Sequence, residues 1–452
     1  MLRSDCRLEQ HKFLPRESSV ALLPSYEKLL GPEVIRDLEG YRKKLHGRKI
    51  IHVNSTFDGG GVAEILQREV QLSNELGVAM EWYKVHGDDD FFHVTKELHN
   101  ALQGKSPADP HSLVERYQDF FQNGGGVLNK ALIDYLRSAG AESIVVLHDP
   151  QPLFLINFIN KSRALKLWRV HIDTTTPDSI TISYITGQAV KCDGIISTME
   201  HFMRPHVNGF RDLFILPPSI DPFSEKNSEM DRCEVVERVH QHGITERTPL
   251  LVQVSRLDPW KDPVGVIRAF EKVRSLGRAC QLALVYNSAS DDPEGSEMER
   301  IVRSVRERSP YRADIFLVPG DDPRDVNAFQ RYAGVVIQKS IREGFALTVT
   351  EALYKGSVVV ATEVGGITLQ VQDRVTGFTV KPYGVDGRGF PLCEREYQEH
   401  IAAVAQKCIE ALELPELEKS LAEKGRERVV SKFLATAKLK SLYDIALSFD
   451  PN

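Results

Sequence analysis

Two pairs of charged residues have types and spacing suited to binding a phosphorylated sugar. Glu343 and Glu351 lie eight positions apart, with a glycine directly after the first. Arg256 and Lys261 lie on one loop that follows the apolar run 250–254. Fixed cations stabilise a leaving diphosphate as it gains negative charge, and carboxylates accept hydrogen bonds from sugar hydroxyls. The combination predicts an enzyme that handles a nucleotide-activated sugar.

Each pair also has a purely structural interpretation. The two cations could form exposed ion pairs with Asp258 and Asp262, worth under about 1 kcal/mol. Glu351 could be an acid near a helix N-terminus, which the helix dipole stabilises by about 0.3–1 kcal/mol. Glu343 could form an ion pair with a neighbouring cation. The occurrence of both pairs in one half of the chain favours the functional interpretation.

A glycine-rich turn follows the predicted strand 49–54 and precedes a predicted helix over 62–76. Its residues are Asp58, Gly59, Gly60 and Gly61. Such a turn exposes backbone amides at a helix N-terminus, where an anion or a sugar can bind. It is not the dinucleotide-binding fingerprint, because Glu64 stands where that motif requires a glycine. The alternative is a tight strand-to-helix turn, for which fewer glycines would suffice.

Polar residues follow two further predicted strands. His148, Asp149 and Gln151 come after the strand 143–147, and His171 and Asp173 come at the end of the strand 164–172. Imidazole and carboxylate groups at strand ends can hydrogen-bond to sugar hydroxyls. Alternatively, each aspartate caps a following turn.

Strand and helix patterns alternate along most of the chain. The region up to about residue 47 and the region from about 396 onward have helical periodicity. The expected strands between them are 49–54, 78–85, 143–147, 164–172, 194–197, 250–254, 281–285, 315–318, 335–337 and 357–361. This alternation predicts an α/β protein with parallel sheets covered on both faces.

The length of 452 residues predicts two domains. The boundary is expected near the proline-rich stretch 217–222, after which the alternation of strand and helix patterns restarts. We expect an N-terminal domain over 1–228 and a C-terminal, nucleotide-sugar-binding domain over 229–431, with a final helix at about 432–452 that packs back on the first. Both would be Rossmann-like, doubly wound domains that face each other across a cleft. Ligands in such sheets bind beyond the carboxyl ends of the strands, and all the candidate loops lie there.

The bulk properties exclude several classes of protein. The formal net charge is -6, which is unlike a nucleic-acid binder. No apolar run approaches the length of a membrane span, and no signal peptide is apparent, so we expect a cytoplasmic protein. The six cysteines have no metal-ligand spacing, and the acidic run at 291–294 does not match a calcium loop, so no metal site is expected.

Longer segments of the chain resemble a known family. The stretch Gln-Val-Ser-Arg-Leu-Asp-Pro-Trp-Lys-Asp at 253–262 and the stretch Ser-Ile-Arg-Glu-Gly-Phe at 340–345 are similar to trehalose glycosyltransferring synthases, which are retaining GT-B enzymes of glycosyltransferase family 4. The segments 52–64, 147–152, 168–173, 217–222 and 291–295 share this resemblance and occur in the family's order.

The resemblance implies a reaction. Glucose would pass from ADP-, UDP- or GDP-glucose to the anomeric hydroxyl of a second glucose, giving α,α-trehalose with retention. The leaving phosphate itself would take the acceptor proton. The family implies no essential cofactor or metal, although Mg²⁺ could accompany the diphosphate, and a homodimer is one option. The nucleotide and the physiological direction stay open.

The resemblance also implies a role for each matching residue. Arg256 and Lys261 would hold the diphosphate, Glu351 the ribose and Glu343 the donor glucose, while His171 and Asp173 would touch the transferred sugar. The donor-binding set is Gly59, Gly60, Gly61, Arg256, Lys261, Tyr286, Glu343, Gly344, Phe345, Ala346, Leu347 and Glu351. The acceptor-binding set is Asp58, Gly60, His148, Asp149 and Gln151.

Two residues depart from the family pattern. Ala346 stands where the family has glycine, and Tyr286 stands where it tends to glycine after a strand, so Tyr286 could narrow the nucleotide pocket or supply a stacking ring. A sucrose-synthase-like transferase with another acceptor and a nucleotide-sugar-binding protein without turnover are the alternatives. A nicotinamide dehydrogenase is disfavoured, because the fingerprint is absent.

Overall fold

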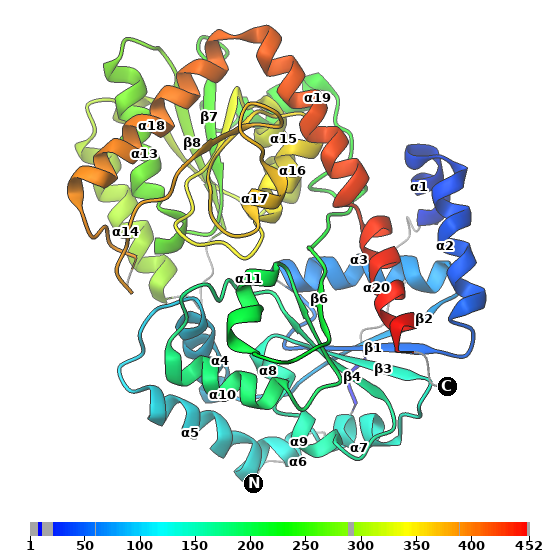
Figure 1. The fold of residues 1–452 in the computed structure, drawn as a ribbon. Helices are drawn as coiled ribbons and strands as arrows, with labels where there is room; N and C mark the ends of the chain where they lie inside the picture. Colours follow the sequence, from blue (N-terminus) through cyan, green and yellow to red (C-terminus); the bar gives the residue numbers. More distant parts are fainter. Residues whose placement is uncertain (1–7, 11–20, 59, 288–292, 388, 450–452) are drawn as a thin grey trace. The chain divides into compact units, whose positions relative to one another are not determined.

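The computed structural model describes residues 8–10, 21–58, 60–287, 293–387 and 389–449, and it is shown in Figure 1. The described residues form two compact units, one drawn from Met1–Pro218 and Ala435–Asn452 and the other from Ser219–Leu434. The linker 219–228, which we expected in the first domain, belongs to the second unit. Asn327 fastens it there, because its side-chain amide donates to the carbonyls of Glu225 and Ser228 at 3.0 and 2.8 Å.

The first unit contains a six-stranded sheet in the order β2-β1-β3-β4-β5-β6, and every neighbouring pair is parallel. Its strands are β1 (Lys49–Asn54), β2 (Ala79–Lys84), β3 (Ser143–His148), β4 (Leu165–Val170), β5 (Gly194–Ser197) and β6 (Leu213–Ile215). The strand order reverses between β1 and β3, which makes this a doubly wound sheet.

The second unit repeats the pattern with the order β12-β11-β10-β7-β8-β9, again parallel throughout. Its strands are β7 (Leu250–Val254), β8 (Gln281–Tyr286), β9 (Ile315–Pro319), β10 (Val335–Gln338), β11 (Val359–Thr362) and β12 (Phe378–Val380). The order reverses between β7 and β10. The predicted α/β class and both doubly wound sheets are confirmed.

Helices connect the strands of both sheets. Those of the first unit are α1 (Leu22–Leu30), α2 (Pro32–Lys44), α3 (Gly61–Glu75), α4 (Asp89–Leu102), α5 (Pro110–Phe120), α6 (Gly126–Leu128), α7 (Lys130–Ser138), α8 (Pro150–Leu153), α9 (Ile156–Ile159), α10 (Ser179–Ala189), α11 (Glu200–Met203) and α20 (Ala435–Ser448). Those of the second are α12 (Arg232–His240), α13 (Pro263–Ser275), α14 (Pro293–Arg308), α15 (Pro323–Tyr332), α16 (Leu347–Tyr354), α17 (Ile367–Gln370), α18 (Glu394–Glu413) and α19 (Pro415–Lys432).

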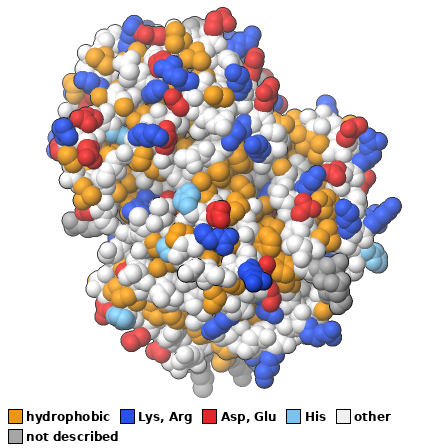
Figure 2. All heavy atoms as spheres, in the orientation of Figure 1, with side chains coloured by type: hydrophobic (Ala, Val, Ile, Leu, Met, Phe, Trp, Pro, Cys, Tyr) orange, Lys and Arg blue, Asp and Glu red, His pale blue; other side chains and the backbone are white. Residues whose placement is uncertain are grey.

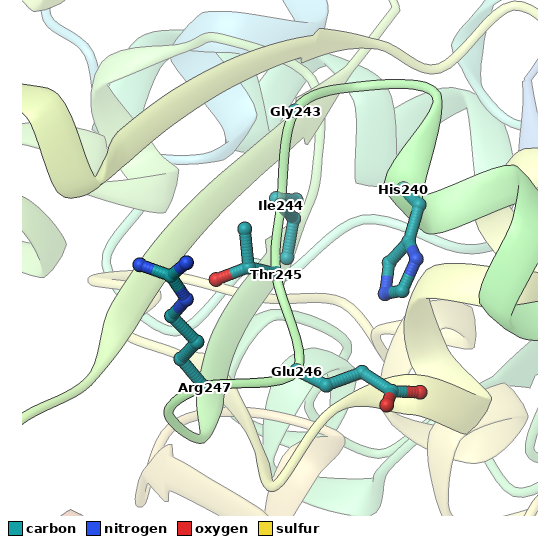
Figure 3. A pocket seen from close by; sticks show the side chains of 6 residues that line it. All are labelled: His240, Gly243, Ile244, Thr245, Glu246 and Arg247. Atoms are coloured by element: carbon teal, nitrogen blue, oxygen red, sulfur yellow. The ribbon is translucent and has the colours of Figure 1, made fainter.

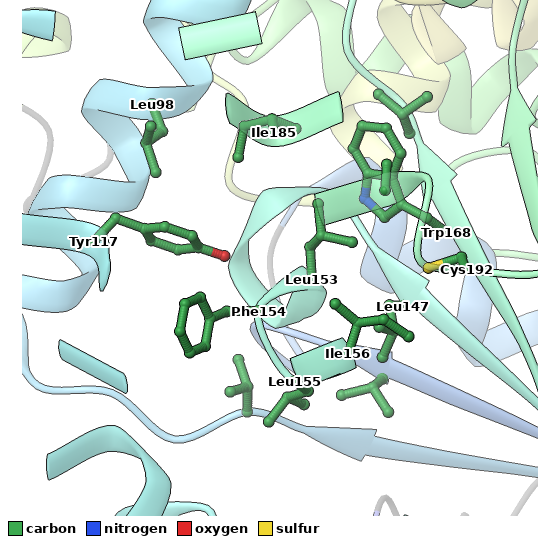
Figure 4. Packing of buried hydrophobic residues seen from close by; sticks show 14 of the residues in the cluster. Leu98, Tyr117, Leu147, Leu153, Phe154, Leu155, Ile156, Trp168, Ile185 and Cys192 are labelled. Atoms are coloured by element: carbon green, nitrogen blue, oxygen red, sulfur yellow. The ribbon is translucent and has the colours of Figure 1, made fainter. Parts of the chain in front are cut away.

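The main core of the first unit covers one face of its sheet. Figure 4 shows Leu147 and Trp168, from β3 and β4, among the side chains of Leu153, Phe154 and Ile185. Successive side chains of a strand point to opposite faces. The even-numbered residues of β1 and β3 and the odd-numbered residues of β4 therefore point to the other face. The last helix, α20, packs against α2 and α3 within the same unit (Figure 1).

The surface carries charges of both signs. Figure 2 shows acidic and basic side chains interspersed with apolar ones over the visible face. Among the described residues, no helix is both long enough and apolar enough to cross a membrane.

Candidate functional site

Most of the predicted site residues follow the strands at which each sheet reverses its order, whereas His171 and Asp173 follow β4 and Tyr286 ends β8. The 58–61 turn follows β1 and His148 ends β3, whereas Arg256 and Lys261 follow β7 and Glu343 follows β10. Crevices outside the carboxyl ends of strands at such reversals are where open α/β sheets bind ligands. Each unit therefore has one candidate region.

In the second unit, the loops after β7 and β10 are joined to each other. The backbone N–H of Ile341 donates to the carbonyl of Trp260 at 2.7 Å. The guanidinium of Arg342 lies 5.4 Å from the centroid of the Trp260 ring, in cation–π range. The two loops therefore form one surface.

Lys261 and Glu343 form an ion pair on this surface. Lys261 Nζ lies 2.5 Å from Glu343 Oε2, and the Ser340 hydroxyl donates to the same oxygen at 3.2 Å. Both side chains are largely buried, so this pair is weakly screened. An ammonium group in this position presents fixed positive charge beside a carboxylate that can accept hydrogen bonds.

Arg256 is held less firmly. Its side chain is 65% exposed, and its nearest ionic partner is Asp258 at 3.3 Å. The ion pair between Arg256 and Asp258, which the sequence offered as the structural alternative, is therefore present. Its predicted role in holding a diphosphate stays a prediction.

Behind the surface, a buried lysine connects the two loops again. Lys339, directly after β10, forms an ion pair with Asp262, and its ammonium lies 4.7 Å from the ring centroids of both Tyr383 and Tyr397. The two tyrosine hydroxyls donate to Asp262 at 2.9 and 3.2 Å. Asp262 also caps α13 by accepting from Gly265 N–H at 2.9 Å. Sequence reasoning missed this cluster.

The loop before α16 has an unusual backbone. Ala346 has φ 70° and ψ 77°, a left-handed conformation in which a Cβ atom is strained. Gly344, Phe345 and Ala346 are buried, and Leu347 begins α16. Glu351 is buried in the second turn of that helix, which agrees with its expected place.

Two residues that the sequence did not single out shape this loop. A Cβ atom at Gly366 would lie 2.6 Å from Gly344 O and from Phe345 Cα, so only glycine fits there. The Gln370 side-chain amide donates to Phe345 O at 2.5 Å. Gly366 and Gln370 therefore fix the backbone of the loop at Gly344 and Phe345.

Tyr286 ends β8 and packs within the core of the second unit. Its hydroxyl donates to Glu299 at 2.9 Å and lies 3.2 Å from an Arg303 nitrogen, and burial raises the pKa of this phenol to about 12. A ring enclosed by the core is not placed to stack on a base. The structure thus favours a packing role over the stacking role considered from the sequence.

In the first unit, the glycine-rich turn has open space above it. Gly60 has φ 80°, and a Cβ atom there would meet no heavy atom within 4 Å. Asp58 and Gly61 are exposed, and Gly61 begins α3. Gly59 lies outside the described residues. The turn leaves room for a ligand, and its role in binding one stays a prediction.

Asp149 is strained and buried. Its φ of 60° and ψ of -172° belong to a region that glycine occupies almost exclusively. Its carboxylate accepts from the backbone N–H of His171 at 2.8 Å, while its carbonyl accepts from the Trp168 indole at 2.9 Å. Burial raises the pKa of Asp149 to about 7. The side chain does not cap α8, contrary to the capping alternative.

The remaining predicted residues differ in their surroundings. The Asp173 carboxylate accepts from both the backbone N–H and the hydroxyl of Thr175, at 3.0 and 2.6 Å, as a turn cap does. Gln151 and His171 are half-buried. His148 is buried and lies 3.1 Å from His171 between ring nitrogens. Sequence reasoning missed His52, whose ring lies 2.8 Å from His148.

A separate surface hollow of 530 Å³ lies in the second unit (Figure 3). It is lined by the last residue of α12, His240, and by residues of the segment that connects α12 to β7, namely Gly243, Ile244, Thr245, Glu246 and Arg247. This segment enters β7 at its amino end, away from the carboxyl end where ligands of such sheets bind. Within the described ranges, no group of three or more His, Cys, Asp or Glu side chains could hold a metal ion.

Comparison with known proteins identifies two matching families. Residues 52–204 match the trehalose synthase N-terminal domain, and residues 237–387 match group 1 glycosyl transferases. A trehalose synthase from Pyrococcus horikoshii is 36% identical over 424 residues, which cover 94% of this chain and 95% of that protein.

More distant similarity extends to other enzymes and to a solved structure. A trehalose phosphorylase from Pleurotus pulmonarius is 28% identical, over 74% of this chain and 50% of its own length. A crystal structure of an Anabaena protein in complex with UDP and glucose superposes with a TM-score of 0.64 at 13% identity, covering 89% of this chain and 100% of that chain. At that identity, the superposition supports the fold alone.

Proposed function

The chain belongs to the trehalose synthase family of group 1 glycosyl transferases, and from this premise we propose that it transfers glucose from a nucleoside-diphosphate glucose to glucose, with retention, to form α,α-trehalose. The observation that carries the proposal is the buried Lys261–Glu343 ion pair on the joined loops after β7 and β10. In this pair, Lys261 offers a cation for a diphosphate, and Glu343 offers a carboxylate that can accept hydrogen bonds from a sugar.

The chemistry of the step follows from these groups. The bond between C1 of the donor glucose and the diphosphate oxygen breaks, and a bond from C1 to the acceptor's anomeric oxygen forms on the same face. The acceptor proton passes to the leaving phosphate oxygen. Lys261, with Arg256 closing on the diphosphate, stabilises the charge that develops on the leaving group. Glu343 accepts hydrogen bonds from the donor sugar.

The test is a direct assay of product. The purified chain is incubated with glucose and, separately, with ADP-, UDP- and GDP-glucose, and the products are read by proton NMR. An α,α-linked disaccharide supports the proposal and identifies the nucleotide. Saturable donor binding without any disaccharide in the presence of glucose would overturn it in favour of another acceptor or of binding alone.

One relative favours a second candidate reaction. The similarity to a trehalose phosphorylase raises phosphorolysis, in which inorganic phosphate replaces the nucleotide. The assay therefore includes trehalose with phosphate as a further arm. Glucose phosphate released there, with no turnover of nucleotide sugars, would assign the chain to phosphorolysis.

A further inference from the structure

Two consecutive residues of the loop after β7 contact two consecutive residues of the loop after β10. Lys261 forms an ion pair with Glu343. One residue earlier on each loop, the guanidinium of Arg342 lies over the ring of Trp260, 5.4 Å from its centroid. The Trp260 carbonyl also accepts from the N–H of Ile341 at 2.7 Å. The contact between Trp260 and Arg342 is therefore the immediate neighbour, on both loops, of the pair that we propose for donor binding.

The ring of Trp260 is enclosed by the second unit. Only 8% of this residue is exposed. It lies in a short 3-10 helix, Pro259–Lys261, so Lys261 belongs to the same turn. A Cβ atom at Gly389 would lie 3.5 Å from Trp260 Cζ3 and 3.8 Å from Pro259 Cβ, so the backbone of a segment distant in sequence packs against this turn. The indole therefore offers a fixed surface on which the guanidinium packs.

The contact with Arg342 restricts the second loop. The attraction between a cation and an indole is stronger where water is partly excluded. Arg342 is half-buried and the ring beneath it is buried. Glu343 is the next residue, so a fixed Arg342 side chain limits how far the backbone that carries the Glu343 carboxylate can move. A displacement of about 1 Å in a reacting group can cost about 100-fold in rate.

We propose that Trp260 and Arg342 are positioning residues, whose contact holds Lys261 and Glu343 at the spacing that a sugar diphosphate needs. The inference rests on the proposed function for the identity of that ligand. In this role neither Trp260 nor Arg342 contacts the donor itself. Both act on the reaction only through the residue that follows them in the chain.

The first test examines the contact and needs neither substrate nor activity. The chain contains three tryptophans, and the other two, Trp82 and Trp168, lie in strands of the first unit. The full chain is labelled with fluorotryptophan, and the fluorine NMR signal of Trp260 is assigned by its loss in Trp260→Phe. Arg342→Met should shift the Trp260 signal and leave the other two in place. An unmoved Trp260 signal would overturn the proposal.

The second test measures the donor-binding pair itself. Lys261→Met, Glu343→Gln and the double variant are denatured chemically, first in the wild-type background and then with Arg342→Met. The departure from additivity is the coupling between Lys261 and Glu343. We expect the Arg342→Met background to lose at least about half of this coupling. A coupling that keeps its full size, or that is absent in both backgrounds, would overturn the positioning role.

The third test is kinetic. Trp260→Leu and Arg342→Met should each lower kcat roughly 10- to 100-fold and change KM for the donor less than about threefold, because Lys261 acts mainly on the charge that develops in the transition state. The double variant should be no slower than either single variant, since both remove the same contact. Losses that multiply in the double variant would overturn the proposal.

Conservative variants and a matched control complete the kinetic test. Arg342→Lys keeps a cation over the ring and should recover most of the lost kcat. Arg374→Met removes a cation that lies 5.9 Å from the Phe378 ring, away from both loops in sequence, and should change neither kcat nor the Trp260 signal.

The inference and the proposed function fail separately. If no nucleotide sugar is turned over, the proposed function fails, and the fluorine signal and the coupling still decide whether Trp260 and Arg342 position the pair. If trehalose is formed and Arg342→Met leaves kcat unchanged, the inference alone is overturned.

Discussion

Lys339 and Asp262 form a buried ion pair that connects the two loops carrying Lys261 and Glu343. Asp262 follows Lys261 in sequence, and Lys339 lies four residues before Glu343. The buried pair therefore fixes the spacing of the two residues that we propose for donor binding. Its aromatic walls, Tyr383 and Tyr397, keep water from the ammonium group.

Lys339→Met should destabilise the protein by about 3–5 kcal/mol, because it leaves the Asp262 carboxylate buried without its cation. Chemical denaturation measures this change. The control is Lys381→Met, which removes an exposed partner of Glu363 and should cost under about 1 kcal/mol. Equal effects of the two substitutions would contradict the role of Lys339.

Glu343→Gln should lower kcat by orders of magnitude while the protein stays folded. The amide cannot form the ion pair with Lys261, whose position would no longer be fixed. Trehalose formation measures activity, and circular dichroism confirms folding. Glu410→Gln, which breaks an ion pair with Arg374 at the surface, is the matched control. Unchanged turnover of Glu343→Gln would remove this residue from the mechanism.

Arg256→Lys tests whether the exposed guanidinium closes on a diphosphate. If it acts as a two-pronged phosphate ligand, kcat/KM should fall by the equivalent of about 2–4 kcal/mol. A loss smaller than tenfold would favour the alternative in which Arg256 only pairs with Asp258.

Ala346→Gly should stabilise the protein by about 1 kcal/mol, because glycine adopts the left-handed conformation without strain. Denaturation midpoints measure the change. Ala402→Gly, within α18, should have the opposite sign and cost about 1 kcal/mol, since its backbone is helical. A destabilised Ala346→Gly protein would show that the methyl group contributes packing that outweighs the strain.

Asp149→Asn should change how stability depends on pH. In the folded protein Asp149 stays protonated up to about pH 7, whereas in the unfolded chain it ionises near its ordinary pKa of 3.8. The folded state thus binds more protons in this window, and the free energy of unfolding falls as pH rises from about 4 to about 7, by roughly 4 kcal/mol at most.

The asparagine amide does not titrate and still accepts from His171 N–H, so this fall should disappear. His52, His148 and His171 contribute the opposite slope, because burial lowers their pKa values in the folded protein, whereas their rings protonate below about pH 6.5 in the unfolded chain. The difference between wild type and variant therefore isolates Asp149. Parallel stability curves from pH 4 to pH 8 would contradict the assignment.

Local patterns predicted the elements and the loops that carry the site. The alternation of strand and helix periodicity was enough to predict both parallel sheets. Polar residues at strand ends indicated that the loops after β1, β3, β7 and β10 carry the site. The strands β6 and β12 were missed because each has only three residues and lies at a sheet edge. A run that short carries no periodicity.

The partners of the site residues could not be predicted, because they are distant in sequence. Lys261 is 82 residues from Glu343, and Lys339 is 77 residues from Asp262. His52 lies inside a strand, where its neighbours suggested burial and not a site. Only the register of three strands brings it into line with His148 and His171.

The position of α20 also bears on how the protein is made. This helix supplies Lys438 to the first unit, yet it is synthesised after the whole of residues 219–434. As the chain leaves the ribosome from its N-terminus, the first sheet is complete long before its buried cation arrives. Glu69 must therefore stay without this partner until α20 has been made. The ion pair that neutralises Glu69 is thus completed only after the whole of the second unit has been made.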